Sequence, residues 1–213
     1  MSRKPAVLDL FCGAGGASMG YHQAGFEVFG IDINPQPEYP FEFRQMDVLA
    51  IRSYNFGNRY DLIHASPPCQ RFSTITPRPL DHPDLIAPTR SLLINSKLPY
   101  VIENVPAAPL LDPVILCGSM FSLKVRRHRK FESNWHIEPL SHKHAEQGQP
   151  WGIYGNGGGT DVPRVGGGSR GRKAKQSDFA ALMEMPWATP RGIVQAIPPA
   201  YTRYVGEQFL LIG

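Results

Sequence analysis

Short apolar runs recur along this chain, and they constrain its fold more than any other feature. They cover residues 6–11, 27–32, 60–65, 100–105 and 112–118, with helical or loop-like stretches between them. Continuous apolar runs of this length are typical of parallel strands that are buried on both faces. Their alternation with helical segments predicts a doubly wound α/β sheet.

Several intervening segments have the apolar spacing of helices. Residues 18–25 end on Gly25, a residue that commonly follows a helix C-terminus. Residues 89–97 and 178–187 are further candidates, and the segment after residue 198 starts with two prolines, as helices often do. Residues 134–176 lack a sustained periodicity, so we expect an irregular segment with one or two short strands.

The length of 213 residues suits one domain, and the 3 cysteines favour a reducing compartment over a disulfide framework. Asp9 interrupts the first apolar run, so we expect a strand there and no export signal. No apolar stretch is long enough to cross a membrane, so we expect no membrane association.

Positive charge is concentrated in one part of the chain. Residues 120–175 hold 11 Lys and Arg against 4 Asp and Glu, whereas the formal net charge of the whole chain is only +4. This distribution is typical of a local face that binds a polyanion. A solvated basic loop is the alternative.

A glycine-rich loop follows the first apolar run. Gly13, Gly15 and Gly16 let the backbone turn tightly and approach a ligand closely. Asp32 ends the second run, where an acidic side chain can accept hydrogen bonds from ribose hydroxyls. With Asp47 near another predicted strand end, the pattern indicates a cofactor that carries a nucleoside. An ordinary strand-to-helix turn with surface acids is the alternative.

Two reactive side chains lie near the ends of two other apolar runs: a cysteine follows the run at 60–65, and a glutamate lies near the end of the run at 100–105. Cys69 comes directly after Pro67 and Pro68, which fix the backbone that presents it, and Glu103 ends the run at 100–105. Because ligands bind outside the carboxyl ends of parallel strands, both groups should face one site. A thiolate there would be a nucleophile if nearby positive charge stabilised it. The candidates for that charge are Arg71, Arg127 and Arg129.

The remaining cysteines and the histidines have simpler readings. Cys12 and Cys117 lie within or beside apolar runs, which favours burial as small apolar residues. His142 and His144, with His136 nearby, could suggest a metal, but no paired Cys-x-x-Cys and no second ligand cluster accompany them. We therefore expect no metal.

At these residues the chain resembles the cytosine-C5 DNA methyltransferases. The segments DLFCGAGG (9–16), SPPCQRFS (66–73), ENV (103–105), RRHR (126–129) and QAIPPAYT (195–202) match motifs of that family, in its order. The resemblance implies a Rossmann-like S-adenosylmethionine-dependent methyltransferase sheet. It also implies a covalent bond from Cys69 to C6 of a cytosine that is flipped out of the DNA, and methyl transfer to C5.

The family's motifs assign roles residue by residue. Phe11 would stack on the adenine of S-adenosylmethionine, Asp32 would bind its ribose, Asp47 would bind the adenine amino group, and Glu103 would hold the target base. The residues assigned to catalysis are Cys69, Gln70, Glu103, Arg127 and Arg129. The residues assigned to the cofactor are Asp9, Phe11, Gly13, Gly15, Gly16, Asp32, Ile33, Asp47, Pro68, Gln195 and Ala196. Those expected to contact DNA are Arg71, Ser73, Arg164, Arg170, Arg172, Lys173 and Lys175.

The chain departs from the family pattern in three places. Val125 stands where the family usually has Gln, and Val194-Gln195 where it usually has Gly-Asn. Only residues 134–177 are available for target recognition, so we expect a short Gly-rich basic insert between catalytic segments 1–133 and 178–213. Trp135 and Trp151 could fill the gap left by a flipped base, but packing in the core is the expected role of each.

Several alternatives stay open at this point. The same C5 chemistry could act on single-stranded DNA or on free cytosine nucleotides, as the short insert suggests. A binding module could keep the cofactor fold without catalysis, and a nicotinamide-dependent oxidoreductase would account for the glycine loop alone. On the family reading we expect DNA as partner, no membrane or metal, a monomer, and the cytoplasm of a bacterial or phage-infected cell.

Overall fold

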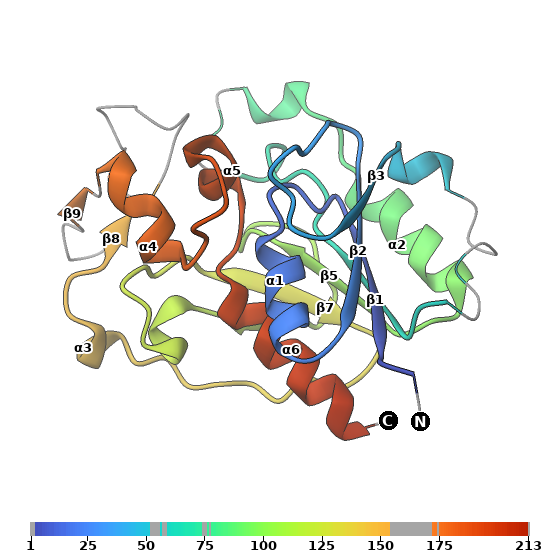
Figure 1. Ribbon diagram of the computed structural model, residues 1–213. Coiled ribbons are helices and arrows are strands. Elements are labelled where there is room, and N and C mark those ends of the chain that lie inside the picture. Colours follow the sequence, from blue (N-terminus) through green and yellow to red (C-terminus); the bar gives the residue numbers. More distant parts are fainter. Residues whose placement is uncertain are drawn as a thin grey trace.

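A seven-stranded mixed sheet forms the centre of the molecule, with the strand order β3-β2-β1-β4-β5-β7-β6 (Figure 1). The computed structural model describes residues 3–51, 56, 59–73, 76, 78–153, 172–173 and 175–212. Its strands are β1 (Ala6–Leu10), β2 (Glu27–Asp32), β3 (Glu42–Gln45), β4 (Leu62–Ala65), β5 (Tyr100–Asn104), β6 (Val114–Leu116) and β7 (Arg129–Ser133). The predicted Rossmann-like α/β sheet is confirmed.

The four inner apolar runs form parallel strands, as the sequence predicts. β1 pairs with β2 on one side and β4 on the other, and β4 pairs with β5, all in parallel. Every residue of β1, β4 and β5 is buried. Burial on both faces explains why these strands read as continuous apolar runs rather than alternating ones.

The last apolar run was predicted as a buried parallel strand, and this prediction is wrong. β6 pairs antiparallel with β7 at the edge of the sheet, and its Ile115 is exposed. β7 itself inserts antiparallel between β5 and β6. A strand end was expected near Asp47, and β3 ends close to it, at Gln45. β7 was not predicted, because its residues are largely polar and form no apolar run.

Helices cover both faces of the sheet. The main helices are α1 (Gly16–Gln23), α2 (Ile86–Ser96) and α6 (Pro199–Ile212). One core contains Val7, Leu62 and Val101 of the strands together with residues of α1 and α6. The other contains the neighbouring strand residues Leu8, Ile63 and Ile102 with residues of α2. The predicted helices at 18–25 and 89–97, and the helix predicted after Pro198, are confirmed within a few residues.

Shorter elements complete the described chain. They are the helices α3 (His144–Gln147), α4 (Phe179–Met183) and α5 (Pro190–Gln195), the 3₁₀ turns η1 (Val48–Ala50), η3 (Pro79–Asp81), η4 (Gly118–Phe121) and η5 (Gln176–Asp178), and the strands β8 (Trp151–Gly152) and β9 (Arg172–Lys173). β8 and β9 pair in parallel, which confirms the short strands expected within residues 134–176. None of the described helices combines the length and the apolar character that a membrane span needs.

Close packing of α1 against the last segment depends on two glycines. A Cβ at Gly16 would lie 2.3 Å from the carbonyl oxygen of Ile197. At Gly20 it would lie 2.1 Å from the carbonyl oxygen of Pro199 and 2.1 Å from Thr202 Oγ1. The Thr202 hydroxyl donates to the carbonyl oxygen of Ala17 at 2.7 Å. The last helix can therefore approach the glycine loop that precedes α1.

We predict that Gly20→Ala destabilises the protein by about 1–3 kcal/mol, the usual cost of overpacking. In a free helix, replacing glycine by alanine stabilises the helix by up to ~1 kcal/mol. Here the new Cβ would clash with the backbone of Pro199, and we expect this clash to outweigh the gain, so the free energy of unfolding should fall. Urea denaturation measures the free energy of unfolding. Gln23→Ala, an exposed substitution in the same helix, is the control and should change it by less than about 0.5 kcal/mol. Equal stability of both variants would show that the helices have room to separate.

Candidate active site

The candidate site lies where β1, β4 and β5 end at the same edge of the sheet. In the ladder Leu10 lies beside Ala65, which lies beside Ile102, so the three strands end at nearly the same level. The Ser66 N–H also donates to the carbonyl oxygen of Leu10 at 3.1 Å. The glycine loop, the Cys69 loop and Glu103 therefore start from adjacent positions.

The glycine loop turns through three residues with left-handed backbone. Phe11 has φ 59°, Gly13 48° and Gly15 80°. Such a conformation is uncommon for a bulky residue such as Phe11 and is frequent at functional sites. A Cβ added at Gly13 would meet no atom within 4 Å, whereas one at Gly15 would lie 3.1 Å from Tyr39 and Pro40. The space beside Gly13 is thus free of other atoms of the described chain, whereas the space beside Gly15 is filled.

Asp32 fixes the loop from the neighbouring strand. Its Oδ2 accepts from the Gly13 N–H at 3.0 Å, and its Oδ1 accepts from the Asn34 N–H at 2.8 Å. Two carboxylate oxygens have about four acceptor positions between them, so Asp32 retains capacity for a further donor. Ile33 beside it is 58% exposed. Asp47 is also exposed and accepts from the Leu49 N–H at 2.9 Å at the start of η1.

Asp9 lies beneath the loop and not at its surface. Its carboxyl is fully buried and hydrogen-bonds to the Ser18 hydroxyl, which also lies 2.6 Å from the Tyr39 hydroxyl. Burial raises the pKa of Asp9 to about 7. Its Oδ1 has no hydrogen-bond partner among the described residues. Through Ser18, Asp9 holds the first turn of α1 against β1.

The Cys69 loop is tied down by a side chain from β5. The Asn104 amide donates to the carbonyl oxygen of Pro67 at 2.8 Å, and its Oδ1 accepts from the Val105 N–H at 2.9 Å. A turn then follows, in which the Phe72 N–H donates to the carbonyl oxygen of Cys69 at 3.0 Å. Pro68 and Gln70 flank Cys69, and all three are half-buried.

Opposing charges act on the Cys69 thiol. Burial raises its pKa, and the Glu103 carboxylate raises it further, while the guanidinium groups of Arg129 and Arg127 lower it. Two of the three arginines predicted to stabilise a thiolate are therefore close enough to act. Arg71 instead donates to the carbonyl oxygen of Leu80 at 2.7 Å, which ties the Cys69 loop to η3.

Glu103 is a buried carboxylate that faces an arginine. Arg129 Nε lies 3.0 Å from Glu103 Oε1, and the two side chains are only 14% and 7% exposed. The pair is in ion-pair contact, but its angle does not meet the geometry of a hydrogen bond, so this buried oxygen has no hydrogen-bond partner among the described residues. Burial raises the pKa of Glu103, whereas Arg129 and a hydrogen bond from Ser66 lower it.

A chain of polar side chains leads from α1 toward Glu103. The Tyr21 hydroxyl lies 3.1 Å from His64 Nδ1, and His64 Nε2 lies 3.0 Å from Ser66 Oγ. Burial lowers the pKa of His64 to about 3, so the ring is neutral. We assign the proton to Nε2, because Nδ1 can then accept from Tyr21 and the Ser66 hydroxyl is left to donate to Glu103.

The last segment returns to the glycine loop, as the sequence predicts. Arg127 Nη2 donates to the carbonyl oxygen of Val194 at 2.6 Å, and the Tyr201 hydroxyl donates to that of Arg127 at 2.7 Å. Trp187 Nε1 donates to the carbonyl oxygen of Ala14 at 2.8 Å. Ala196 packs beside Gly16, and Gln195 is exposed. Arginine motif and final motif are thus joined directly.

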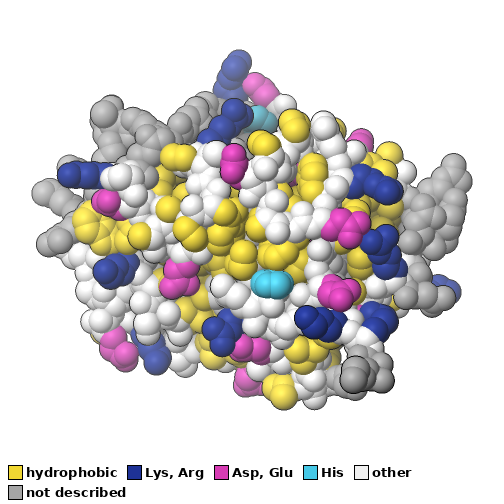
Figure 2. Space-filling model, in the orientation of Figure 1, with side chains coloured by type: hydrophobic (Ala, Val, Ile, Leu, Met, Phe, Trp, Pro, Cys, Tyr) yellow, Lys and Arg dark blue, Asp and Glu magenta, His cyan; other side chains and the backbone are white. Residues whose placement is uncertain are grey.

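The predicted DNA-contacting residues are more scattered. Ser73 is half-buried on the Cys69 loop and Lys175 is exposed. Arg172 and Lys173 form β9, whereas Arg164 and Arg170 lie outside the described residues. Figure 2 shows basic and acidic side chains interspersed on the face that it presents, so the described part of that face is not uniformly basic. Trp135 and Trp151 pack against the core, as expected.

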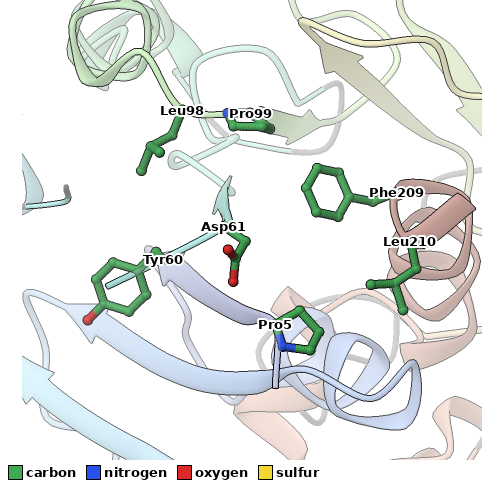
Figure 3. Close-up of a pocket in the computed structure, with 7 residues that line it drawn as sticks. All are labelled: Pro5, Tyr60, Asp61, Leu98, Pro99, Phe209 and Leu210. Atoms are coloured by element: carbon green, nitrogen blue, oxygen red, sulfur yellow. The ribbon is translucent and has the colours of Figure 1, made fainter. Parts of the chain in front are cut away.

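A hollow at the amino ends of the strands, opposite the candidate site, is separate from that site. It is lined by Pro5, Tyr60, Asp61, Leu98, Pro99, Phe209 and Leu210 (Figure 3). Pro5, Asp61 and Pro99 each precede a strand, so the hollow lies at the amino ends of β1, β4 and β5. Asp61 accepts from Arg3 and from the Ala6 N–H there, and its role is structural.

Sequence reasoning missed His64, Ser66 and the contact role of Asn104. The available signal was the alternation of side chains along a strand. Asp9, His64 and Glu103 each lie two residues after an apolar core residue of the α1 face, namely Val7, Leu62 and Val101. Asp9 and His64 lie side by side in the ladder and Glu103 lies two residues further along β5, so polar residues mark the carboxyl end of that face.

Comparison with known proteins supports the motif assignment. Residues 6–107 match the family model of the C-5 cytosine-specific DNA methylases. That range contains the glycine loop, Asp32, the Cys69 loop and Glu103.

Two curated bacterial proteins are similar in sequence over part of their length. The type II methyltransferase M.XorII of Xanthomonas oryzae pv. oryzae is 32% identical over 143 residues, which are 60% of this chain and 31% of that protein. The type II methyltransferase M.AplI of Arthrospira platensis is 35% identical over 71 residues, 32% of this chain and 21% of that protein. The matches thus span a third or less of these relatives.

Solved structures share the fold at low sequence identity. The S. pombe Dnmt2 methyltransferase has a TM-score of 0.66 at 16% identity, covering 98% of this chain and 99% of that one. The methyltransferase EhMeth of Entamoeba histolytica has a TM-score of 0.67 at 12% identity, covering 99% of each chain. The family match over residues 6–107 and the curated relatives, on a methyltransferase sheet with the motifs in the family's order, support the assignment of this chain to the cytosine-C5 methyltransferase family.

Proposed function

We propose that this chain transfers a methyl group from S-adenosylmethionine to C5 of cytosine in DNA, with Cys69 as the nucleophile. The observation that carries the proposal is one cluster at the end of β4 and β5. There a half-buried thiol is acted on electrostatically by Glu103, Arg127 and Arg129, beside a glycine loop suited to a cofactor.

The loop residues fit the proposed cofactor. Gly13 leaves open space next to Asp32, whose carboxylate can still accept a hydrogen bond from a ribose hydroxyl. Phe11 offers a ring for stacking, and exposed Ile33 and Asp47 flank the same edge. S-adenosylmethionine supplies an electrophilic methyl group when bound. We assign Asp9 to supporting the loop, and Gly15, Gly16, Pro68, Gln195 and Ala196 to its walls.

The reaction on cytosine follows from the two central side chains. The Cys69 thiolate adds to C6, and the electron pair of the C5–C6 double bond makes C5 nucleophilic. Glu103 hydrogen-bonds N3 and the exocyclic amine, and its raised pKa favours holding a proton there. Once C5 carries the methyl group, loss of the C5 proton restores the C5–C6 double bond and expels the Cys69 thiolate. Arg127 and Arg129 counter the negative charge that passes through the site.

DNA is the proposed substrate, and because Cys69 is half-buried, the target base has to leave the stack to reach it. We assign phosphate contacts to Arg71, Ser73, Arg164, Arg170, Arg172, Lys173 and Lys175, and the recognition role to residues 134–177. The described part of that segment packs on the core through Ile137 and Ile153. A monomeric enzyme in the bacterial cytoplasm is consistent with the type II relatives.

The first experiment is mass spectrometry of nucleosides after incubation with S-adenosylmethionine and unmethylated DNA. Wild-type protein should produce 5-methylcytosine, Cys69→Ser none, and Glu103→Gln about 10²–10⁴-fold less. Parallel reactions contain duplex DNA, single-stranded DNA and free dCMP. Product from dCMP alone would replace DNA by nucleotides as substrate. No product from any substrate, with S-adenosylmethionine bound, would refute the proposed reaction.

The charges around Cys69 make a second prediction, measured by alkylation with iodoacetamide at different pH. Because burial and Glu103 raise the pKa of the thiol, its reaction rate in wild-type protein should keep rising above the pH at which a free thiol levels off. Glu103→Gln removes a negative charge and should lower this midpoint, whereas Arg129→Gln removes a positive charge and should raise it.

Peptide mass spectrometry follows the Cys69 peptide alone in this assay. The buried Cys12 and Cys117 peptides are the internal control and should stay unmodified in the folded protein. A midpoint that moves up in Glu103→Gln, or that does not respond to either variant, would contradict the close placement of the three groups.

The Asn104 contact predicts a loss of rate without loss of cofactor binding. Asn104→Asp keeps the acceptor for Val105 but replaces the donor to the Pro67 carbonyl by an oxygen, which should displace the Cys69 loop. We expect kcat to fall about 10–100-fold. Asn134→Asp is the matched control, because Asn134 donates to Leu98 and accepts from Tyr100 at the other end of β5. Its kcat should remain at the wild-type value, and an equal fall in both variants would indicate a general loss of stability.

A further inference from the structure

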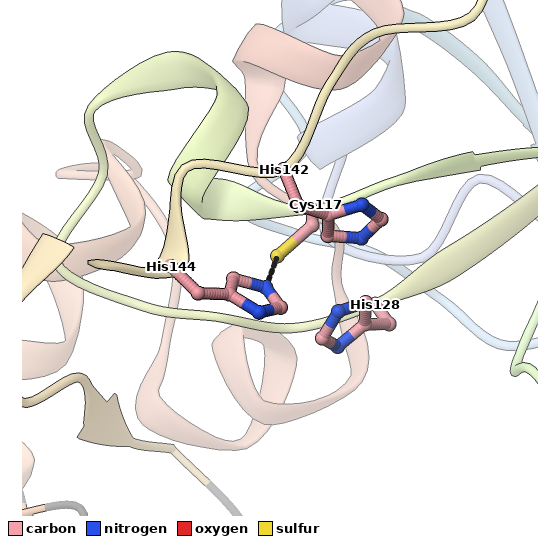
Figure 4. A group of neighbouring side chains, drawn as sticks. All are labelled: Cys117, His128, His142 and His144. Atoms are coloured by element: carbon pink, nitrogen blue, oxygen red, sulfur yellow. Dashed lines mark hydrogen bonds between the residues drawn. The ribbon is translucent and has the colours of Figure 1, made fainter. Parts of the chain in front are cut away.

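Four metal-binding side chains meet away from the glycine loop and Cys69. Cys117, His128, His142 and His144 each offer one ligand atom, and these atoms all lie within 4.8 Å of one another. Figure 4 shows the three imidazole rings grouped around the Cys117 sulfur. The ring centroids are 4.8–5.2 Å apart.

The ligands come from three different parts of the fold. Cys117 follows β6 and precedes η4, and His128 directly precedes β7. His142 lies in the loop before α3, and His144 begins that helix. The sequence argument against a metal rested on the lack of a second ligand group near His142 and His144. That premise is wrong, because the antiparallel β6–β7 edge brings Cys117 and His128 to them.

We propose that these four side chains bind a zinc ion as a structural site. One thiolate and three imidazoles form a donor set that suits Zn²⁺, which prefers four-coordinate tetrahedral geometry. Bonds of 2.0–2.3 Å require ligand atoms about 3.3–3.8 Å apart, so the longest separation in the cluster needs to contract by up to ~1.5 Å. With four protein ligands no open position remains, which indicates a structural and not a catalytic ion.

Hydrogen bonding alone explains this cluster poorly. The Cys117 thiol donates to the carbonyl oxygen of Arg126 at 2.8 Å, and His144 Nε2 lies 3.4 Å from the sulfur. In the described part of the chain, however, the rings of His128 and His142 have no hydrogen-bond partner. Three imidazoles packed around one sulfur, two of them without such a partner, are arranged as ligands are.

The surroundings would hold the ligands in place. The Ser119 hydroxyl donates to Cys117 Sγ at 3.4 Å and accepts from the backbone N–H of Lys143, between two of the histidines, at 3.3 Å. Arg126 Nε donates to Gln147 Oε1 at 3.0 Å and so fixes α3 against the strand. Hydrogen bonds of this kind around the ligands orient metal sites and stabilise their charge.

The position gives the ion a structural role next to the candidate active site. His128 lies between Arg127 and Arg129, and Arg129 pairs with Glu103. An ion bound here would join these arginines to the segment that contains α3, in addition to the hydrogen bonds that Gln147 donates to the carbonyl oxygens of Leu123 and Val125. This role rests on the proposed function, but metal binding itself does not.

Metal content tests the inference without any measurement of methylation. Untagged protein, expressed with zinc and passed through gel filtration, is analysed by inductively coupled plasma mass spectrometry. Wild type should retain one zinc per chain, and Cys117→Ser and His142→Ala should each lose it. His142 is exposed, so His142→Ala should fold even if Cys117→Ser does not. The matched controls Cys12→Ser and His136→Ala should retain the ion, since neither residue belongs to the cluster.

Cobalt substitution identifies the ligands. Protein stripped with a chelator and titrated with Co²⁺ should show the visible bands of tetrahedral cobalt and a thiolate charge-transfer band that Cys117→Ser abolishes. Zinc should displace the cobalt and raise the Tm of wild type but not of His142→Ala. Wild-type protein that holds no more zinc than His142→Ala, and shows no tetrahedral cobalt spectrum, would overturn the proposal.

Discussion

The ion pair between Glu103 and Arg129 is the interaction on which the candidate site depends. A carboxylate buried at the end of β5 is costly unless a cation accompanies it, and losing one partner of such a pair typically costs about 3–5 kcal/mol. The cation comes from β7, so the sheet must place this antiparallel strand beside β5. A second buried pair, Arg90 with Glu132 at 2.7 Å, holds β7 against α2. The edge of the sheet that departs from parallel order is thus the edge that supplies the charge near Cys69.

Close contacts also join the last segment of the chain to the first helix. Gly16 and Gly20 let the last segment pack on α1, and Arg127 reaches from the strand side to the carbonyl oxygen of Val194. The glycine loop is therefore enclosed by residues far away in the sequence, as the hydrogen bond between Trp187 and Ala14, 173 positions apart, shows. Arg127 and Arg129, two residues apart, connect the final segment on one side and Glu103 on the other. The group between them, His128, is the one that we assign to zinc.

Much of this arrangement was accessible from the sequence because its signals are local. Buried parallel strands are apolar throughout, so β1, β2, β4 and β5 were predicted within two residues of their bounds. The glycine loop, Cys69 behind two prolines and Glu103 at a strand end each lie in one short motif. The rule that parallel strands place their carboxyl ends at one edge then brought these motifs together.

Only the tertiary structure decided which polar residues distant in the sequence contact one another. β3 lies at the edge of the sheet and β7 carries charged residues that form buried ion pairs, so neither has an apolar run. β7 is the strand that runs against the others, because it pairs antiparallel with both β5 and β6, and β6 therefore points the same way as β5. The Tyr21–His64–Ser66–Glu103 chain and the grouping of Cys117 and His128 with His142 and His144 follow from packing. The sequence alone determined the strands and the reactive motifs, since hydrophobic burial and backbone conformation depend on neighbouring residues. A hydrogen bond or a metal ligand set depends on distances in space, which only the folded chain defines.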